Sequence, residues 1–189
     1  SGRLAIKSNY VIDATGDADV CYLAGDDVIS LDTNRRSGWF FSKRDEEINL
    51  HMLHDSIHDE LPEGTKMFSG DDGKEVSLMN ITARKMIKDC LNEINCGPRK
   101  EYDEYPILIP TIPQFRMTRR IKTSFELKES HNKKVFEDSI GMTGDWRNSG
   151  PIFQIPYRCI RSENIDNLLV AGRCISTKTS AWDITRVIP

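Results

Sequence analysis

Two short apolar runs, each followed by a turn that contains glycine, stand out in the hydrophobic pattern of this chain. Residues 10–12 (YVI) lead into residues 15–17 (TGD), and residues 168–171 (LLVA) lead into residues 172–173 (GR). A short apolar run closed by glycine is typical of a buried strand that ends in a tight turn. In α/β sheets, ligands collect at such strand ends, where glycine lets the backbone approach them closely. Both turns are therefore candidate binding sites, and a core strand that ends in an ordinary surface turn is the open alternative.

The first turn also predicts a short helix over residues 18–25, with Asp17 as its N-cap and Gly25 as its C-cap. The first peptide N–H groups of such a helix have no partner within it, so an anion or a ribose could lie on the turn. An ordinary capped helix without a ligand explains the same pattern.

Apolar spacing in the middle of the chain predicts two amphipathic helices, joined by a turn-rich segment at residues 64–74 that favours a short hairpin. The first helix ends at Pro62, and its apolar face consists of Ile48, Met52, Leu53, Ile57 and Leu61. The second is capped by Ser77 and stops at residues 95–98 (NCGP), and its apolar face consists of Leu78, Ile81, Met86, Cys90, Leu91 and Ile94.

The second half of the chain favours strands. Residues 106–112 (PILIPTI) form an apolar run broken by prolines, which favours a strand at a sheet edge. Residues 121–128 alternate enough to predict a strand, and residues 152–160 predict another that bends at Pro156. Between these two segments, the glycines at 141, 144 and 150 indicate a flexible loop around Trp146.

His51, His54 and His58 would share one face of the first amphipathic helix. Spacings of three and four residues can present imidazoles to a metal ion. The pattern has no glutamate between paired histidines and no fourth ligand in register, so we interpret it as a polar helix face and predict no metal site.

Length, charge and cysteine content limit the classes of protein to which this chain can belong. The 189 residues, 38% of them hydrophobic, are enough for one domain with a core, and the net charge of −3 does not indicate a nucleic-acid surface. No apolar run approaches the roughly 20 residues that span a bilayer. Five cysteines, an odd number without CxxC spacing, predict reduced thiols in a cytoplasmic protein rather than disulfides or a zinc knuckle.

Several blocks of the sequence resemble a known family. These blocks are VIDATGDADVCYLAG, IPQFRMTRRI, DSIGMTGDW, IPYRC, NLLVAGRCIS and AWDITRVIP. In this order they resemble the later part of the FAD-dependent oxidoreductases of the two-dinucleotide-binding-domain flavoprotein type. The resemblance covers about half of the chain, at residues 10–25, 112–121 and 139–189, and residues 26–105 show none.

The resemblance implies an α+β fold in which a substrate-side domain is flanked by strands of an FAD-binding α/β domain. It assigns residues 1–25 and 161–189 to the FAD side and residues 26–160 to the substrate side. The family's GxGxxG fingerprint is missing, because no two glycines are separated by one residue. A continuing polypeptide is also expected after Pro189. We therefore expect an internal piece of a longer enzyme that is inactive on its own.

The resemblance also implies site residues. Ala14, Thr15, Gly16 and Asp17 would line the adenosine side of FAD, and Ala171, Gly172, Arg173, Cys174, Ile175 and Ser176 would pass along its ribityl chain and ring. Trp146, Tyr157 and Arg158 would lie near the ring. Arg173 stands where related flavoproteins often carry an aspartate that binds the ribityl chain.

Arg119 and Arg120 are the candidate catalytic residues. If this segment is a strand, Arg116 and Arg120 point one way and Arg119 the other, whereas a helix would put all three on one face. The resemblance favours Arg119 or Arg120 facing the flavin or the substrate. A fixed guanidinium suits the anionic reduced flavin and also a substrate carboxylate. A basic surface patch is the alternative interpretation.

The expected reaction is hydride transfer between FAD and a small organic substrate, without nucleic acid or membrane as partner. A non-catalytic binding domain, with the histidine-bearing helix as a metal or partner surface, is the competing hypothesis. The sequence identifies no substrate, electron acceptor, proton donor or oligomeric state.

Overall fold

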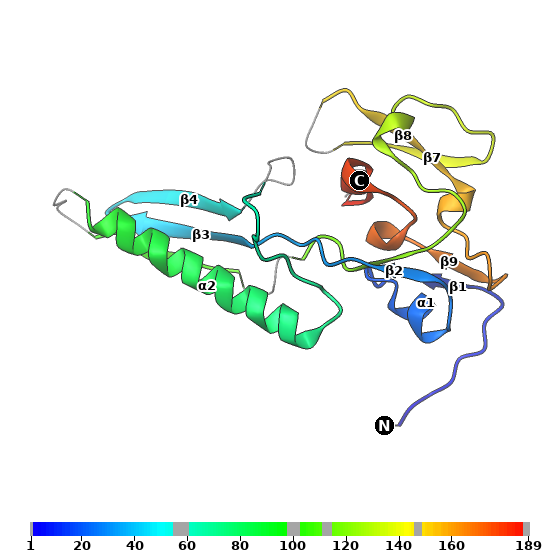
Figure 1. Ribbon diagram of the computed structural model, residues 1–189, viewed down its shortest axis with the longest axis horizontal. Coiled ribbons are helices and arrows are strands. Elements are labelled where there is room, and N and C mark those ends of the chain that lie inside the picture. Colours follow the sequence, from blue (N-terminus) through cyan, green and yellow to red (C-terminus); the bar gives the residue numbers. More distant parts are fainter. Residues whose placement is uncertain (1, 55–60, 98–102, 111–114, 146–148, 187–189) are drawn as a thin grey trace. The chain divides into compact units, whose positions relative to one another are not determined.

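A computed structural model describes residues 2–54, 61–97, 103–110, 115–145 and 149–186 (Figure 1). The chain forms two compact units, one made of Ser1–Ser30 with Arg119–Pro189 and the other of Leu31–Thr118. Helices and several small sheets occur together, so the fold is α+β, as the sequence predicts. The domain limits expected after residues 25 and 160 concern the FAD and substrate sides of an enzyme and stay a prediction.

Parallel strands β1 (Val11–Asp13) and β9 (Leu168–Val170) form the centre of the first unit. Strand β2 (Val28–Ser30) pairs antiparallel with β6 (Arg119–Ile121), and β7 (Ser139–Gly144) pairs antiparallel with β8 (Ile152–Pro156).

Short helices complete this unit. They are α1 (Asp19–Leu23) and the 3-10 helices η1 (Glu129–His131), η2 (Tyr157–Cys159), η3 (Gly172–Cys174) and η4 (Thr179–Arg186).

Two apolar clusters stabilise the first unit. One surrounds β9 and consists of Ala18, Cys21, Ile121, Leu168, Val170, Cys174 and Ile175. The other lies under β8 and η4 and consists of Leu127, Phe153, Cys159, Ala181 and Ile184. Because the first cluster includes residues that flank both glycine turns, it fixes the backbone from which the candidate site is built.

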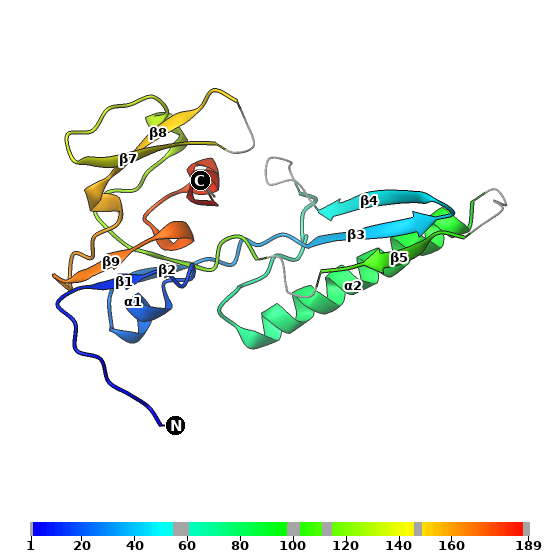
Figure 2. The same cartoon turned by 180° about the vertical axis from the view of Figure 1, so that it is seen from behind.

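The second unit is a three-stranded antiparallel sheet with a long helix on one face (Figures 1 and 2). Its strands β3 (Ser37–Arg44), β4 (Glu47–His54) and β5 (Tyr105–Leu108) follow the order β4-β3-β5. The helix, α2 (Gly73–Asn95), starts at Asp72, whose carboxylate accepts a hydrogen bond of 2.8 Å from the Lys74 N–H.

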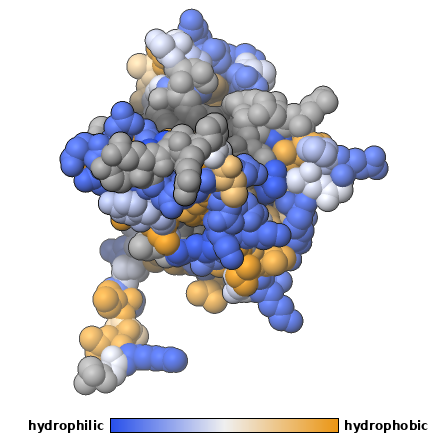
Figure 3. All heavy atoms as spheres, turned by 90° about the vertical axis from the view of Figure 1, so that its left-hand side faces the viewer, coloured by the Kyte–Doolittle hydropathy of each residue, from blue (hydrophilic) through white to orange (hydrophobic). Residues whose placement is uncertain are grey.

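The two faces of this sheet differ in burial. Phe40 is fully buried on the face that α2 covers, together with Met79 and Ile87 of the helix. The other face carries apolar residues that stay exposed on β4 and β5, namely Ile48, Leu50, Met52 and Leu108. In the space-filling view, apolar residues likewise form small groups among hydrophilic ones (Figure 3).

The prediction of a helix that ends at Pro62 is wrong for its first half, because Glu47–His54 is strand β4. The segment carries two competing periods, since Ile48, Leu50 and Met52 also alternate with polar residues as a strand requires. A tight turn at Asp45, with φ of 50°, joins β3 to β4 and decides in favour of the strand. The predicted helical face shared by His51 and His54 is therefore also wrong, because both residues belong to strand β4, while His58 lies outside the described residues.

Two helix predictions are confirmed with changed ends. The expected 18–25 helix is α1, but Asp17 is not its N-cap: Ala18 takes that position without a side-chain hydrogen bond. The C-cap is Ala24, and Gly25, with φ of +78°, is the residue after it, so the predicted helix end was one residue too late. The second predicted helix is α2, which Asp72 caps instead of Ser77.

The strand predictions succeeded in part. β5 lies at a sheet edge as expected, and β8 ends at Pro156, after which η2 follows. Residues 121–128 are not a continuous strand, because only Ile121 belongs to β6. Gly141 and Gly144 lie within β7 rather than in a loop. The hairpin expected in residues 64–74 does not form, because Phe68 pairs with the distant Asn34.

Across the described ranges, no helix has both the length and the apolar character needed to cross a bilayer.

Candidate functional site

The parallel pairing of β1 with β9 brings the two glycine turns to one edge. Asp13 stands opposite Val170, and the Ala171 N–H donates a 2.9 Å hydrogen bond to the Asp13 carbonyl. The Cys174 thiol lies 3.1 Å from the Ala171 carbonyl and 3.6 Å from that of Asp13. The predicted segments 14–17 and 171–176 therefore start from neighbouring strand ends.

Asp13 anchors this edge, and the sequence interpretation missed it. Its buried carboxylate accepts hydrogen bonds from the Thr15 N–H at 3.0 Å, the Thr15 hydroxyl at 2.7 Å and the Cys21 N–H at 3.0 Å. Burial by itself raises the pKa of Asp13, but the bonds from Thr15 and Cys21 outweigh burial and lower it. The sequence did contain a signal for this role, because Asp13 directly follows the apolar run at residues 10–12. The structure shows that Asp13 shapes the turn that follows.

Thr15 connects this anchor to α1. Besides donating to Asp13, its hydroxyl accepts a 3.1 Å hydrogen bond from the Asp19 N–H at the start of α1. Thr15 thus takes the capping role that the sequence assigned to Asp17. The Asp17 carboxylate instead lies 3.3 Å from the guanidinium of Arg173.

Gly16 and Arg173 fit closely together. Gly16 has φ of +82°, and a Cβ built on it would lie 2.9 Å from the Arg173 Nη2. The guanidinium therefore covers this turn and ties it to the segment after β9. The positive φ of this position favours glycine, and an added Cβ would also require the Arg173 side chain to shift.

The space beside Gly172 is open, whereas the Arg173 side chain covers Gly16. It has φ of +76°, and a Cβ built on it would meet nothing within 4 Å. Its backbone can therefore be approached from outside without displacing another group. This is the property that the sequence pattern predicted for the turn.

A buried hydroxyl pair follows Gly172. The Ser176 N–H donates to the Cys159 carbonyl at 2.9 Å, and its hydroxyl lies 3.5 Å from Arg120 Nη1. The next residue, Thr177, is 2% exposed, and its hydroxyl has no hydrogen-bond partner within the described part of the chain. A buried polar group without a partner costs stability, so Thr177 is a place where a ligand group would be accommodated. Sequence interpretation stopped at Ser176 and missed it.

The two candidate catalytic arginines leave β6 on different sides, as the strand alternation predicts. Arg119 forms a 2.7 Å ion pair with Asp19 and lies 4.3 Å from the centre of the Tyr22 ring, so it is held against α1. Arg120 is 6% exposed and forms an ion pair with Glu126. Of the two, Arg120 is the one that reaches the hydroxyl of Ser176.

Glu126 sets the position of Arg120. Burial raises the pKa of this carboxyl, but the hydrogen bond and the charge of Arg120 outweigh it, so its pKa lies below the usual value. An ionised Glu126 fixes one end of the guanidinium and leaves another end for Ser176.

The remaining predicted residues lie in other surroundings. Arg158 forms a 2.7 Å ion pair with Asp138 and lies 4.3 Å from the centre of the Phe125 ring, which ties η2 to the start of β7. Tyr157 is 40% exposed. Trp146 lies outside the described residues. The structure therefore brings neither Tyr157 nor Arg158 into a described contact with the turn at Gly172.

The cysteines of the site are packing groups. All five cysteines are free, and Cys21, Cys159 and Cys174 are buried. Burial raises the pKa of Cys21 and of Cys159 to about 12 and also raises that of Cys174. These thiols are neutral at physiological pH, which argues against a nucleophilic role for Cys174. Among the described residues, no group of three or more His, Cys, Asp or Glu side chains is placed to hold a metal ion.

Comparison with known families shows which family the chain belongs to. The family model described as FAD dependent oxidoreductase matches residues 26–189. The chain belongs to this family. The match includes β9, the open turn at Gly172 and residues 26–105, for which the sequence blocks had given no resemblance. FAD is the cofactor of the family. Neither the curated proteins nor the solved structures compared with the chain give a match.

The residues at this edge fit part of such a cofactor. FAD offers hydroxyl groups and anionic oxygens as hydrogen-bonding partners. The open backbone of Gly172, the buried hydroxyls of Ser176 and Thr177, and the nearby charge of Arg120 complement these groups. The turn at Gly16 fits less directly, because Arg173 already covers it.

Proposed function

We propose that this chain forms part of an enzyme that transfers a hydride between the flavin of FAD and a small organic substrate. The observation that carries the proposal is that an open glycine backbone, Gly172, and a buried hydroxyl with no partner among the described residues, Thr177, both follow β9, the strand that pairs with β1. FAD supplies the redox chemistry when it is bound, and the protein supplies position and charge.

In this proposal the segment 171–176 and Thr177 contact the ribityl and ring side of FAD. Gly172 permits close approach, and the Ser176 and Thr177 hydroxyls offer hydrogen bonds. Residues 14–17 line the adenosine side, where Arg173 contributes the positive charge that covers Gly16. Tyr157, Arg158 and Trp146 stay candidates for the ring side on the strength of the family resemblance.

Arg120 is the stronger catalytic candidate of the two arginines. Its guanidinium stays protonated at all physiological pH values, so it can stabilise a developing negative charge but cannot act as the proton donor. Its contact with Ser176 supports a position near the flavin. Arg119 is engaged by Asp19 and Tyr22, which supports a structural contribution besides the catalytic one.

Residues 1–25 and 161–189 would belong to the FAD side of the enzyme and residues 26–160 to its substrate side. The absence of a GxGxxG segment supports the expectation that these residues alone do not complete the FAD site. The proposal includes a cytoplasmic location, because five unpaired cysteines suit a reducing compartment.

Two glycines give a matched test of the proposed FAD contact. Gly25 and Gly172 have nearly the same positive φ, and neither has an atom within 4 Å of an added Cβ. Alanine at either position costs about 1 kcal/mol of backbone strain. We expect Gly172→Ala to weaken FAD binding by the full polypeptide and Gly25→Ala to leave it unchanged, as measured by titration of flavin fluorescence. Equal effects of both substitutions would remove Gly172 from the site.

Hydride transfer needs a separate test. Small organic acids and alcohols would be screened for anaerobic loss of flavin colour in the FAD-loaded polypeptide. A substrate deuterated at the reacting carbon should then reduce the flavin more slowly than the protonated one. Reduction without an isotope effect on the chemical step would argue for another mechanism of electron transfer.

A further inference from the structure

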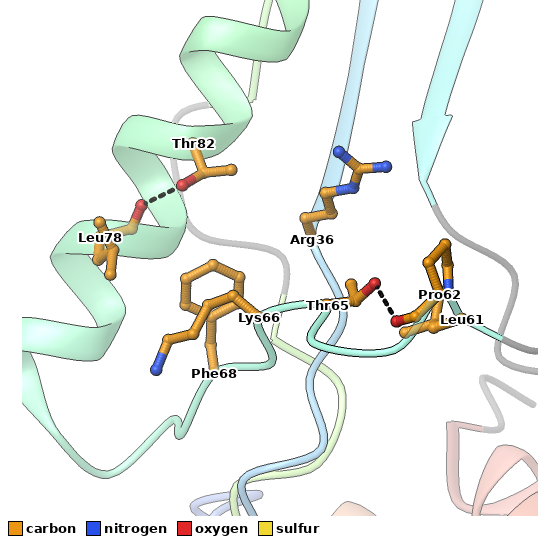
Figure 4. A pocket seen from close by; sticks show the side chains of 8 residues that line it. All are labelled: Arg36, Leu61, Pro62, Thr65, Lys66, Phe68, Leu78 and Thr82. Carbon is orange, nitrogen blue, oxygen red and sulfur yellow. Dashed lines mark hydrogen bonds between the residues drawn. The ribbon is translucent and has the colours of Figure 1, made fainter.

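A second candidate site lies in the unit Leu31–Thr118 and consists of other residues than those proposed for FAD. It is a cavity of about 400 Å³ (Figure 4), within the range of roughly 300–1,000 Å³ that is typical of small-molecule sites. Its lining comes from the residue just before β3, the segment before α2, and α2 itself: Arg36, Leu61, Pro62, Thr65, Lys66, Phe68, Leu78 and Thr82.

The aromatic wall of this cavity is fixed in place. Phe68 is 2% exposed, and its backbone exchanges two hydrogen bonds with Asn34, at 2.8 and 3.2 Å. Leu78 and Thr82 are one helical turn apart on α2 and present a second wall (Figure 4). The apolar lining is therefore held by regular structure.

The polar groups of the lining favour an anion. Arg36 and Lys66 can both donate hydrogen bonds, and none of the described lining residues is a carboxylate. The Lys66 ammonium forms an ion pair with Glu75 at 2.8 Å, so its charge is balanced at the surface. Arg36 has five N–H donors in a planar fork, and the geometry of this fork matches a carboxylate.

The threonine hydroxyls of the lining already donate their hydrogens to backbone carbonyls. Thr65 donates to the Pro62 carbonyl at 2.7 Å and Thr82 donates to the Leu78 carbonyl at 2.9 Å. Their hydrogens are therefore in use, and their oxygens can accept. A single guanidinium above an apolar wall suits a monoanion better than a phosphate dianion.

We propose that this cavity binds a small organic carboxylate with an apolar body, whose carboxylate meets Arg36 and whose body packs on Phe68 and Leu78. The proposal does not depend on FAD, so it can fail while the proposed function holds, and the reverse.

The ligand class is tested by calorimetric titration of the full chain with hexanoate, hexanamide and hexyl phosphate. We expect saturable one-to-one binding of hexanoate, and about tenfold weaker binding of the amide, which cannot form a charge-assisted bond. Binding of the amide or the phosphate as tight as that of hexanoate would overturn the carboxylate assignment, as would absence of hexanoate binding at millimolar concentration.

The position is tested by variants. Arg36→Gln should weaken hexanoate binding about tenfold, whereas Lys88→Gln, an exposed cation on α2 outside the lining, should not. Thr82→Leu should fill the cavity and abolish binding. Ser77→Leu is its matched control, because Ser77 also donates to a carbonyl one turn earlier but does not line the cavity. Unchanged binding in Arg36→Gln and Thr82→Leu, or methyl shifts on binding that spare Leu61 and Leu78, would overturn the proposal.

Discussion

At the scale of single residues, the candidate site depends on one buried carboxylate. Asp13 receives three hydrogen bonds from the turn and helix that follow β1, which orders residues 14–17. The glycine turns themselves could be predicted from the sequence, because glycine marks positions of positive φ. The role of Asp13 could not, because the sequence does not show which carboxylate will be buried among N–H donors.

Substitution of Thr15 tests this anchor. Thr15→Ser keeps the hydroxyl that joins Asp13 to the start of α1 and should change the free energy of unfolding little. Thr15→Val keeps the shape but loses both side-chain bonds, and we expect a loss of about 1–3 kcal/mol in chemical denaturation. Equal stabilities of the Ser and Val variants would contradict the capping role.

The lowered pKa of Asp13 also predicts an acid dependence. A carboxyl whose pKa is lower in the folded state than its ordinary value of about 3.9 stabilises the fold fully above that value. This contribution is lost as the pH falls through the folded pKa. Denaturation at a series of pH values should therefore show stability that is steady near neutrality and falls below about pH 4. Asp13→Asn should be less stable at neutral pH and should lose less on acidification, and an unchanged acid slope would be inconsistent with this account.

At the scale of elements, a buried polar network joins the strands of the second unit. The Glu104 carboxylate, just before β5, forms a 2.7 Å bond with His51 of β4 and a 2.7 Å ion pair with Arg44 of β3, and it also accepts from Ser42. Asn95 at the end of α2 bonds to the Glu104 backbone at 2.8 and 2.9 Å. In this network the His51 ring bonds to Glu104 and so links β4 to the segment before β5.

Removal of the Glu104 charge should loosen the whole sheet. Burial by itself raises the pKa of Glu104. The hydrogen bonds from Ser42 and His51 and the charge of Arg44 outweigh burial and lower this pKa below its ordinary value, so the group is ionised in the fold. Glu104→Gln should cost about 1–3 kcal/mol of unfolding free energy, because Ser42, Arg44 and His51 lose a charged acceptor that is itself buried. Glu46→Gln, at an exposed turn position, is the control and should have little effect. A Glu104 variant as stable as that control would contradict the network's importance.

Element prediction succeeded where one period dominated. α2 has a long helical repeat and clear end signals, and it was found with an error only at its start. The segment before Pro62 satisfied the helical and the strand period at once, and the hairpin turn at Asp45 decided between them. Partners distant in sequence, such as Phe68 with Asn34, are not encoded in local spacing, so that pairing could not be predicted.

At the scale of the whole molecule, the cysteines differ in burial, and Cys90 is intermediate between the two extremes. Cys21, Cys159 and Cys174 are buried in the first unit with raised pKa values, whereas Cys96 is exposed at the end of α2. We expect Cys96 to react first with a thiol reagent such as DTNB at neutral pH, and the three buried thiols to react only on unfolding. Cys96→Ser should remove the fast phase. Rapid reaction of a buried thiol in the native protein would contradict this packing.

Family membership was predictable because the blocks within residues 112–189 lie in the range that the family model matches. The block at residues 10–25 lies outside that match, and the pairing of β1 with β9 brings it beside the C-terminal block. The contacts of the site were less predictable, since Arg158 and Arg119 proved to be engaged by Asp138 and Asp19. Arg120 met Ser176 only because β6 lies beside η3, which no sequence spacing shows.

The most direct test of the account is the visible absorption spectrum of the full polypeptide that carries this sequence, purified without added flavin and then titrated with FAD. The account predicts flavin absorption bands that correspond to about one FAD per chain, and weaker bands when Gly172 is replaced by leucine. A colourless protein that also fails to take up added FAD would contradict the account.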